Sequence, residues 1–193
     1  MILMKIVSTD IPEVKIIEPD VFGDARGYFF ESWNSVKYTS EGIDCQWIQD
    51  NESCSAYGVL RGLHYQAAPY TQAKLVRVIT GKVLDVAVDI RKNSPTFGKH
   101  VAVELSGENK RQLFVPRGFA HGFAVLSEKA VFAYKCDNVY CPAAERGIAF
   151  NDPALQIDWQ IDISKALLSA KDQHNLLLKD AELFDFNSKE YEQ

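Results

Sequence analysis

The middle of the chain consists of short runs in which apolar residues alternate with polar or small ones. This two-residue periodicity is typical of strands that bury one face of a sheet. The runs stop at turn-forming residues such as Gly81, Gly107 and Pro116. We therefore expect strands at residues 75–79, 83–90, 101–105, 112–115, 123–126 and 130–134.

Many short strands at regular spacing indicate a mainly β chain, folded as an antiparallel barrel or jelly roll. Helical signals are few. One helix is expected around residues 35–41. Near the end of the chain, Ser164 is expected to cap a helix at residues 165–168, with further helix from residue 172 onward. The pattern thus predicts a C-terminal helical extension that begins at about residue 164, and a polar end, residues 187–193, that frays.

Length and composition narrow the class of protein. A chain of 193 residues without repeats or linkers is most simply one domain over residues 1–193. A net charge of −5 and the lack of a Lys/Arg-rich run disfavour a nucleic-acid partner. The sequence has neither an apolar run long enough for a membrane span nor the pattern of a signal peptide. The cysteines, Cys45, Cys54, Cys136 and Cys141, are spaced like neither a zinc site nor a redox pair, so free thiols in a cytoplasmic protein are expected.

Two of the four histidines, His64 and His121, lie beside glycine in aromatic, β-rich segments. They are either a base and its neighbour in a pocket, or half of a metal site. A metal-binding barrel needs at least three converging ligands, and metal cupins supply His-x-His and then Glu in the first motif. Here Gln66 follows His64 at the second position, and Tyr70 and Thr71 stand where the Glu would fall. We therefore expect no metal.

Without a metal, a histidine suits general acid–base chemistry but needs an orienting carboxylate. Asp172 and Asp85 are both candidates for the partner of His64, and the residues alone leave the choice open. Lys74, just before the first expected strand, could stabilise a developing oxyanion. Tyr134 is either a proton donor or an amphipathic core residue.

A second group of polar residues could bind phosphate. Arg26 and Glu31 flank an aromatic segment, residues 27–30. The segment is either an edge strand with a solvated face, or part of a binding site in which Arg26 contacts a phosphate and the aromatic rings lie near a nucleotide base. Arg26, Arg61 and Lys74 together could hold a diphosphate despite the acidic total, because local charge matters more than net charge.

Taken in order, these motifs strongly resemble the dTDP-4-dehydrorhamnose 3,5-epimerase family, a group with the cupin fold. The resemblance covers roughly residues 5–175, and so many ordered matches are far more specific than any single one. The motifs that carry it are residues 24–31, 49–51, 58–66, 74–78, 85–89, 94–98, 116–123, 134–136 with Tyr140, 145–148, 151–153 and 169–172. A cupin-type jelly-roll barrel is the fold that it implies.

The resemblance also implies a reaction, which needs no cofactor. The substrate would be a dTDP-linked 4-keto-6-deoxyhexose, whose C4 ketone acidifies the protons at C3 and C5. His64 would be the base that removes them, with Asp172 pairing to its imidazole. Lys74 would stabilise the enolate oxygen, and Tyr134 would return a proton to the opposite face. Inversion needs proton handling on both faces of a planar enolate, hence two different groups.

Binding roles follow from the same resemblance. Arg61 and Arg26 would contact the diphosphate, Glu31, Gln49 and Asn51 would line the nucleotide or sugar pocket, Tyr140 and Phe22 would stack on thymine, and His121 with Asp85 would support His64. In the family, the strand that carries Arg26 and Glu31 crosses to the partner subunit. The resemblance therefore implies a homodimer with strand exchange.

Three alternatives stay open beside the leading hypothesis, which is a 3,5-epimerase making dTDP-4-dehydro-L-rhamnose for cell-envelope polysaccharide. The first is a single-carbon epimerase or ketoisomerase on a related sugar nucleotide. The second is a non-catalytic sugar-binding cupin, against which four intact catalytic residues argue. The third is a metal-dependent cupin oxygenase, which Gln66 disfavours.

Overall fold

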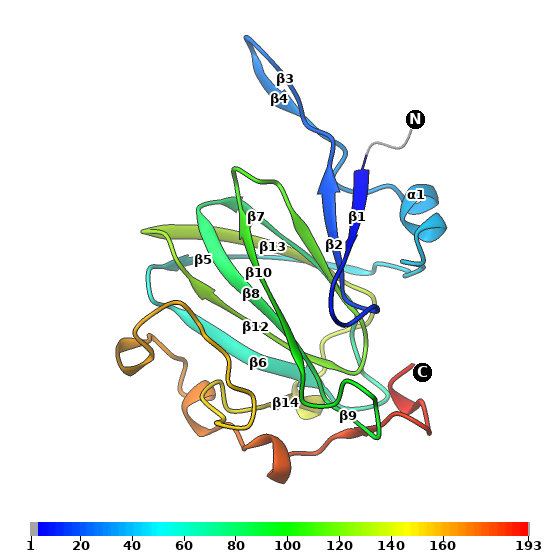
Figure 1. Cartoon of the computed structure of the whole chain (residues 1–193), viewed down its shortest axis with the longest axis vertical. Coiled ribbons are helices and arrows are strands. Elements are labelled where there is room, and N and C mark those ends of the chain that lie inside the picture. The colour runs from blue at the N-terminus through cyan, green and yellow to red at the C-terminus, as the bar shows by residue number, and fades with distance from the viewer. Residues whose placement is uncertain (1–3, 193) are drawn as a thin grey trace.

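The computed structural model describes residues 4–192, in which two antiparallel sheets face each other (Figure 1). The six-stranded sheet has the order β1 (Met4–Ser8), β2 (Lys15–Pro19), β11 (Gln112–Val115), β7 (Lys74–Thr80), β13 (Lys129–Cys136), β5 (Gln49–Ala56). The five-stranded sheet has the order β10 (His100–Ser106), β8 (Lys82–Asp89), β12 (Phe119–Val125), β6 (Leu60–Gln66), β14 (Glu145–Gly147). The expected mainly β jelly-roll class is confirmed, as two sheets rather than one closed barrel.

The space between the sheets holds the main core, and side-chain alternation decides which residues reach it. In β8, Val83 and Ala87 pack in this inner core, whereas Leu84, Val86 and Val88 belong to a second cluster on the outer face. Asp85 falls between the two inner residues and is fully buried. The periodicity that builds the core therefore also carries polar side chains into it.

The six predicted strands are present, and several extend beyond the predicted bounds, one of them in a way that matters for the site. β12 begins at Phe119 rather than at residue 123, so that His121 lies inside the strand. Gly122 is a poor strand former in isolation, which hid the first half of this strand from the sequence pattern. The predicted helix is also confirmed: α1 (Ser35–Ser40) is capped by Asn34, whose side chain accepts a hydrogen bond from the Lys37 amide.

The short helices expected near the end of the chain are present as 3₁₀ turns: η2 (Ile163–Lys165), η3 (Asp172–His174), η4 (Leu178–Asp180) and η5 (Glu190–Glu192). The helix expected at residues 165–168 is not formed, and η2 is capped by Asp162 rather than by Ser164. Between the turns, residues such as Asn175 and Ala181 adopt extended backbone. An extended path lets the segment run along the outer face of the five-stranded sheet, where Trp159 and Leu178 are buried.

Up to residue 192 the end of the chain packs against the protein instead of fraying as expected, and Gln193 lies outside the described residues. Tyr191 is 3% exposed, and its carbonyl accepts a hydrogen bond from the Thr71 hydroxyl. β15 (Phe184–Asp185) pairs in parallel with β9 (Arg91–Lys92) just before it. Buried aromatic contacts thus hold a segment whose sequence is mostly polar. In residues 4–192, no helix has the length and apolar character of a membrane span.

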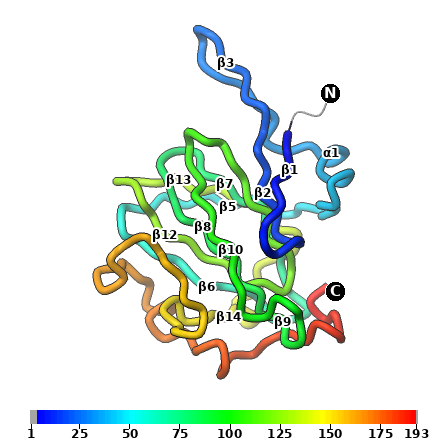
Figure 2. The backbone as a smooth tube through the Cα atoms, viewed as in Figure 1, coloured from blue at the N-terminus to red at the C-terminus, as the bar shows by residue number. Residues whose placement is uncertain are grey.

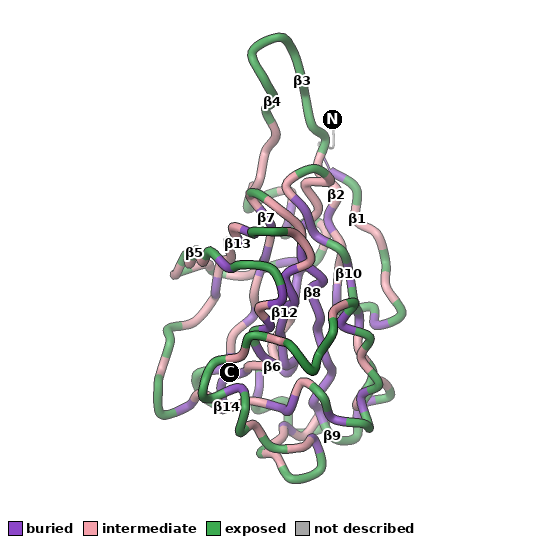
Figure 3. Tube along the Cα trace, turned by 90° about the vertical axis from the view of Figure 1, so that its left-hand side faces the viewer, coloured by how far each residue is buried: buried purple, intermediate pink, exposed green. Residues whose placement is uncertain are grey.

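A hairpin of β3 (Phe22–Asp24) and β4 (Gly27–Phe29) projects away from both sheets, as the smooth trace in Figure 2 makes clear. Every residue of its two strands is exposed, as the green colouring in Figure 3 shows. Phe22 is 50% exposed and Phe29 is 68% exposed. So much exposed aromatic surface on one short element is uncommon and is typical of surfaces that contact other molecules. One further 3₁₀ turn, η1 (Pro142–Ala144), leads into β14.

Candidate active site

Two glycines bring the histidine-bearing strands close together. A Cβ on Gly62 would lie 2.7 Å from Gly122 Cα, and one on Gly122 would lie 2.6 Å from the Arg61 carbonyl oxygen. Gly62 also has a φ of +114°, a conformation that L side chains rarely adopt. With this close approach, His64 on β6 is directly opposite His121 on β12, so that both imidazoles share the inner face of the sheet.

The carboxylate that contacts His64 is that of Asp172. Nε2 of His64 lies 2.5 Å from Asp172 Oδ1, and the exposed fractions of the two side chains are 34% and 2%. A carboxylate can only accept, so the proton belongs on Nε2 and Nδ1 keeps a basic lone pair. Burial would raise the pKa of Asp172, but hydrogen bonds from His64 and Ser169 and the charge of His64 outweigh it and lower that pKa. Asp172 therefore stays ionised beside the imidazole.

His121 has a carboxylate partner of its own. Its Nε2 lies 3.0 Å from each carboxylate oxygen of Asp85, which is fully buried. Burial lowers the pKa of His121, Asp85 opposes this effect, and the nearby charges of Lys74 and His64 add to it. A neutral imidazole behind His64 adds polarity to the pocket without adding a second positive charge.

Lys74 and Tyr134 enter the same space from the opposite sheet. The Lys74 ammonium lies 5.9 Å from the centre of the Tyr134 ring. Burial lowers the pKa of Lys74, although Cys136, Asp85 and Glu145 act in the other direction. Burial also raises the pKa of Tyr134, which keeps its phenol protonated. The pocket thus holds a cation suited to an anionic intermediate and a phenol able to donate a proton.

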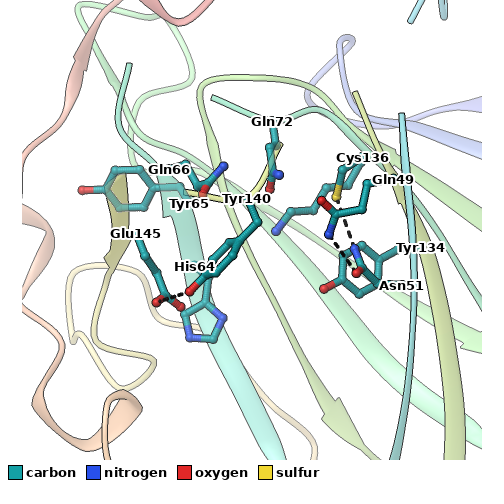
Figure 4. Close-up of a pocket in the computed structure, with 11 residues that line it drawn as sticks. Gln49, Asn51, His64, Tyr65, Gln66, Gln72, Tyr134, Cys136, Tyr140 and Glu145 are labelled. Carbon is teal, nitrogen blue, oxygen red and sulfur yellow. Dashed lines mark hydrogen bonds between the residues drawn. The ribbon is translucent and has the colours of Figure 1, made fainter. Parts of the chain in front are cut away.

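These side chains surround a pocket of about 290 Å³ (Figure 4). Gln49 donates to Asn51 Oδ1 over 2.9 Å, and the Tyr140 hydroxyl donates to Glu145 Oε2 over 2.9 Å. The lining residues are Gln49, Asn51, His64, Tyr65, Gln66, Gln72, Lys74, Tyr134, Cys136, Tyr140 and Glu145. An adjoining hollow of about 320 Å³ shares His64, Lys74 and Tyr134 and adds Arg61 and His121. The volume is suited to a small organic ligand.

Comparison with known proteins agrees with this geometry. Residues 8–180 match the family described as dTDP-4-dehydrorhamnose 3,5-epimerase. A relative of that name from Shigella flexneri is 53% identical over 182 residues, which span 94% of this chain and 99% of the relative.

This chain belongs to the dTDP-4-dehydrorhamnose 3,5-epimerase family.

Solved structures of the epimerase family superpose closely. A 3,5-epimerase from Legionella pneumophila, in complex with dTDP-4-keto-L-rhamnose, is 52% identical with a TM-score of 0.91, over 95% of this chain and 98% of that one. A 3′-monoepimerase from Streptomyces bikiniensis, in complex with dTDP-quinovose, is 33% identical with a TM-score of 0.87, over 94% and 93%. The fold is therefore common to enzymes that differ in how many carbons they invert.

Two charged residues at the pocket, Glu145 and Lys171, were not singled out from the sequence. Glu145 lines it and contacts Lys171, whose Nζ lies 2.5 Å from Glu145 Oε2. Burial would raise the pKa of Glu145, but hydrogen bonds from Lys171 and Tyr140 lower it. Both residues lie in motifs that carried the resemblance, yet no periodic pattern distinguishes them from solvated surface charges.

The structure does not bring all predicted binding residues into the pocket of one chain. Phe22 and Arg26 lie on the projecting hairpin, where the Arg26 side chain is 90% exposed and contacts Asp24. Glu31 lies at the base of the hairpin and pairs with Lys37 over 2.7 Å. None of these three residues lines the pocket or the adjoining hollow around His64.

Gln66 has a structural role at the position where a metal cupin would have histidine. Its amide nitrogen donates to the carbonyls of Tyr70 and Val139, and its oxygen accepts from the Cys141 amide. The side chain therefore joins two loops beside the pocket. Among residues 4–192, no group of three or more His, Cys, Asp or Glu is placed to hold a metal ion. The four cysteines are free thiols.

Proposed function

We propose that this chain epimerises dTDP-4-dehydro-6-deoxy-D-glucose at C3 and C5 to give dTDP-4-dehydro-L-rhamnose. One observation carries the proposal: a histidine oriented by a buried carboxylate, a lysine and a protonated tyrosine border one pocket from both sheets. His64 removes a proton next to the ketone, Lys74 stabilises the enolate oxygen, and Tyr134 returns a proton to the other face. Asp172 holds the imidazole and stabilises its charged form.

The relatives support this choice of substrate. The Legionella pneumophila 3,5-epimerase, which shares 52% of its sequence with this chain, has dTDP-4-keto-L-rhamnose bound. Asn51, Arg61 and Tyr140 border the pocket here and supply an amide, a guanidinium and an aromatic ring for the nucleotide sugar. The bound sugar is the product that C3 and C5 inversion would give.

We also propose that two copies complete each other's sites. The hairpin of one subunit, with Phe22 and Arg26, docks at the pocket of its partner, where Arg26 contacts the diphosphate and Phe22 the thymine. The exposed aromatic surface of the hairpin supports this arrangement, because it is otherwise left in water. A cytoplasmic location is consistent with the four free thiols.

The reaction is tested by proton NMR in deuterated water, with dTDP-4-keto-6-deoxyglucose as substrate. We expect deuterium at both C3 and C5 with the native protein. His64→Asn should slow exchange by about 10³-fold or more, because it removes the base. Tyr134→Phe should leave exchange detectable and impair inversion. Deuterium at one carbon alone would replace the proposal with a single-carbon epimerase, and none at all would contradict it.

Matched controls distinguish chemistry from general damage. His174 is exposed and hydrogen-bonded to the Ala170 carbonyl, and Tyr57 is 57% exposed. His174→Asn and Tyr57→Phe change the same residue types away from the pocket, so both should exchange at the native rate. A loss of rate in either control would mean that the active-site effects are not specific.

Subunit sharing is tested by mixing two inactive variants. Arg26→Ala lacks the donated arginine, and His64→Asn lacks the base. In a mixed dimer, one of the two pockets receives a native hairpin and keeps its own His64, so activity should return after subunit exchange. If each variant stays inactive in every mixture while mixed dimers are detected by native mass spectrometry, the site is built within one chain.

A further inference from the structure

Both oxygens of the Asp172 carboxylate have side-chain partners, and a backbone hydrogen bond from Gly62 also acts on the carboxylate. Oδ1 faces His64 Nε2 at 2.5 Å, and Oδ2 accepts a hydrogen bond from the Ser169 hydroxyl over 2.9 Å. The same hydroxyl accepts the backbone N–H of Asp172 over 3.1 Å. Ser169 therefore holds both the main chain and the side chain of the residue that orients the base.

The segment around Asp172 has little regular structure to fix that residue. η3 is a single turn of three residues, followed by extended backbone at Asn175. The Asn175 amide approaches Asp172 Oδ1 only at 3.5 Å, the outer limit of a hydrogen bond. The Ser169 hydroxyl is a side-chain donor to the second oxygen, so it limits the rotation of a carboxylate that lies on so short a turn.

We propose that Ser169 is a positioning residue for the epimerisation, which fixes the Asp172 carboxylate so that one oxygen stays aligned with His64 Nε2. Ser169 is outside the group of residues that line the pocket, so it acts through Asp172 rather than on the substrate. A fixed oxygen keeps the proton on Nε2 and stabilises the imidazolium that forms when the base accepts a proton. The expected effect of Ser169 on kcat rests on the proposed function. The expected effect of Ser169 on the His64–Asp172 hydrogen bond does not.

The kinetic test is Ser169→Ala. Removing a hydrogen bond to a buried carboxylate should lower kcat by about tenfold to a hundredfold, while KM changes by less than about twofold, because no contact to substrate is lost. Ser169→Thr keeps the hydroxyl and should recover most of the native rate. A native kcat in Ser169→Ala would overturn the proposal, and so would an equal loss in Ser169→Thr.

A spectroscopic test needs no substrate. The proton between His64 and Asp172 should give a low-field proton NMR signal, identified by its absence in His64→Asn. Ser169→Ala should shift or broaden this signal, and Ser169→Thr should retain it. An unchanged signal in Ser169→Ala would overturn the positioning role. A changed signal in a protein without epimerase activity would instead contradict the proposed function alone.

Ser164→Ala is the matched control. The Ser164 hydroxyl and amide both bond to Asp162 Oδ1, over 2.6 Å and 3.1 Å, in the neighbouring turn η2. This is the same kind of local Ser–Asp pair, but without a histidine. Ser164→Ala should leave both the rate and the low-field signal unchanged, and equal effects in the two variants would reduce Ser169 to a structural role. If Ser169→Ala does not fold, Ser169→Cys keeps a weak donor and an intermediate effect is expected.

Discussion

Asp85 and Asp89 lie four residues apart on β8, and both are fully buried. Asp89 is surrounded by donors. Arg91 Nε and Nη2 donate to its two oxygens over 2.8 Å each, and the hydroxyls of Ser94 and Thr96 donate over 2.6 Å each. Burial would raise the pKa of Asp89, but these hydrogen bonds outweigh it and lower that pKa. The result is a permanently ionised, fully satisfied group.

Asp85 is in a different situation on the same strand. It accepts from one imidazole nitrogen of His121, itself a titratable group, and the ammonium of Lys74 is close enough to be affected by its charge. His121 and Lys74, the groups beside Asp85, border a hollow rather than a packed wall. The comparison indicates that burial alone does not distinguish a carboxylate that stabilises the fold from one that takes part in the chemistry of a pocket. A permanently charged partner is typical of the stabilising carboxylate, and a titratable partner beside open space is typical of the carboxylate at a pocket.

The largest expected effect on this comparison comes from Asp89→Asn. The substitution keeps the shape but leaves the buried Arg91 guanidinium with the half-exposed Glu13, 3.2 Å from Nη2, as its remaining counter-charge. The loss of the buried partner should cost about 3–5 kcal/mol of unfolding free energy in urea titrations. Exchange activity per folded molecule should stay near the native value. A variant that is as stable as the native protein would show that the Asp89 cluster is not structural.

The lowered pKa of Asp89 sets the pH dependence of the stability difference between the native protein and Asp89→Asn. A carboxyl group whose folded pKa lies below its ordinary value of 3.8 contributes its full stability above that value and loses it as the pH falls through the folded pKa. The stability gap between the native protein and Asp89→Asn should thus be constant near neutral pH and narrow below about 3.8. A gap that narrows already near pH 6 would point to another group.

Lys74→Met tests the chemical side of the comparison. Exchange should fall by about 10²–10³-fold, the usual loss when one oxyanion donor is removed. Stability should rise by a few degrees in Tm, because burial has lowered the pKa of Lys74 and the charge is held at a cost. The destabilisation that comes from burying the charged Lys74 is present at neutral pH and disappears as the pH approaches 10.5, where the lysine is neutral in the unfolded chain too. The increase in Tm of Lys74→Met should therefore shrink near that pH. Lys82→Met, at a side chain 43% exposed, should change neither quantity.

Asp85→Asn should have the smallest effect of the three. Asparagine can still bond to His121, so the unfolding free energy should change by less than in Asp89→Asn, while exchange falls about tenfold as the pocket loses a negative charge. Calorimetry and the deuterium assay on both variants make the comparison direct, since the same substitution is made on the same strand. A larger stability loss at Asp85 than at Asp89 would reverse the distinction between them.

Much of the fold and the inner part of the site could be predicted from the sequence. Two-residue periodicity located the strands, and it places Lys74, Asp85 and Tyr134 on inner faces because each alternates with buried core residues. The two histidines, His64 and His121, were found as motifs that contain a nearby glycine. Local pattern could identify these residues because strand geometry alone fixes the direction of their side chains.

The remainder depends on tertiary contacts. The segment from about residue 164 was predicted to be helical, but its apolar side chains cover a sheet, which requires an extended path broken by short turns. The contact of Asp172 with His64 joins residues 108 positions apart, beyond the reach of any local pattern. Glu145 and Ser169 owe their environments to that same long-range docking.

The route of the C-terminal segment has a consequence for the order in which the protein is made. All strands of the two large sheets precede Asp172 in the chain, so the walls of the pocket are synthesised before the residue that orients His64. A chain ending near residue 150 would lack Asp172, and it would also lack Trp159 and Leu178, which cover the outer face of the five-stranded sheet. Docking of the C-terminal segment therefore completes the core and aligns the base in one step of assembly.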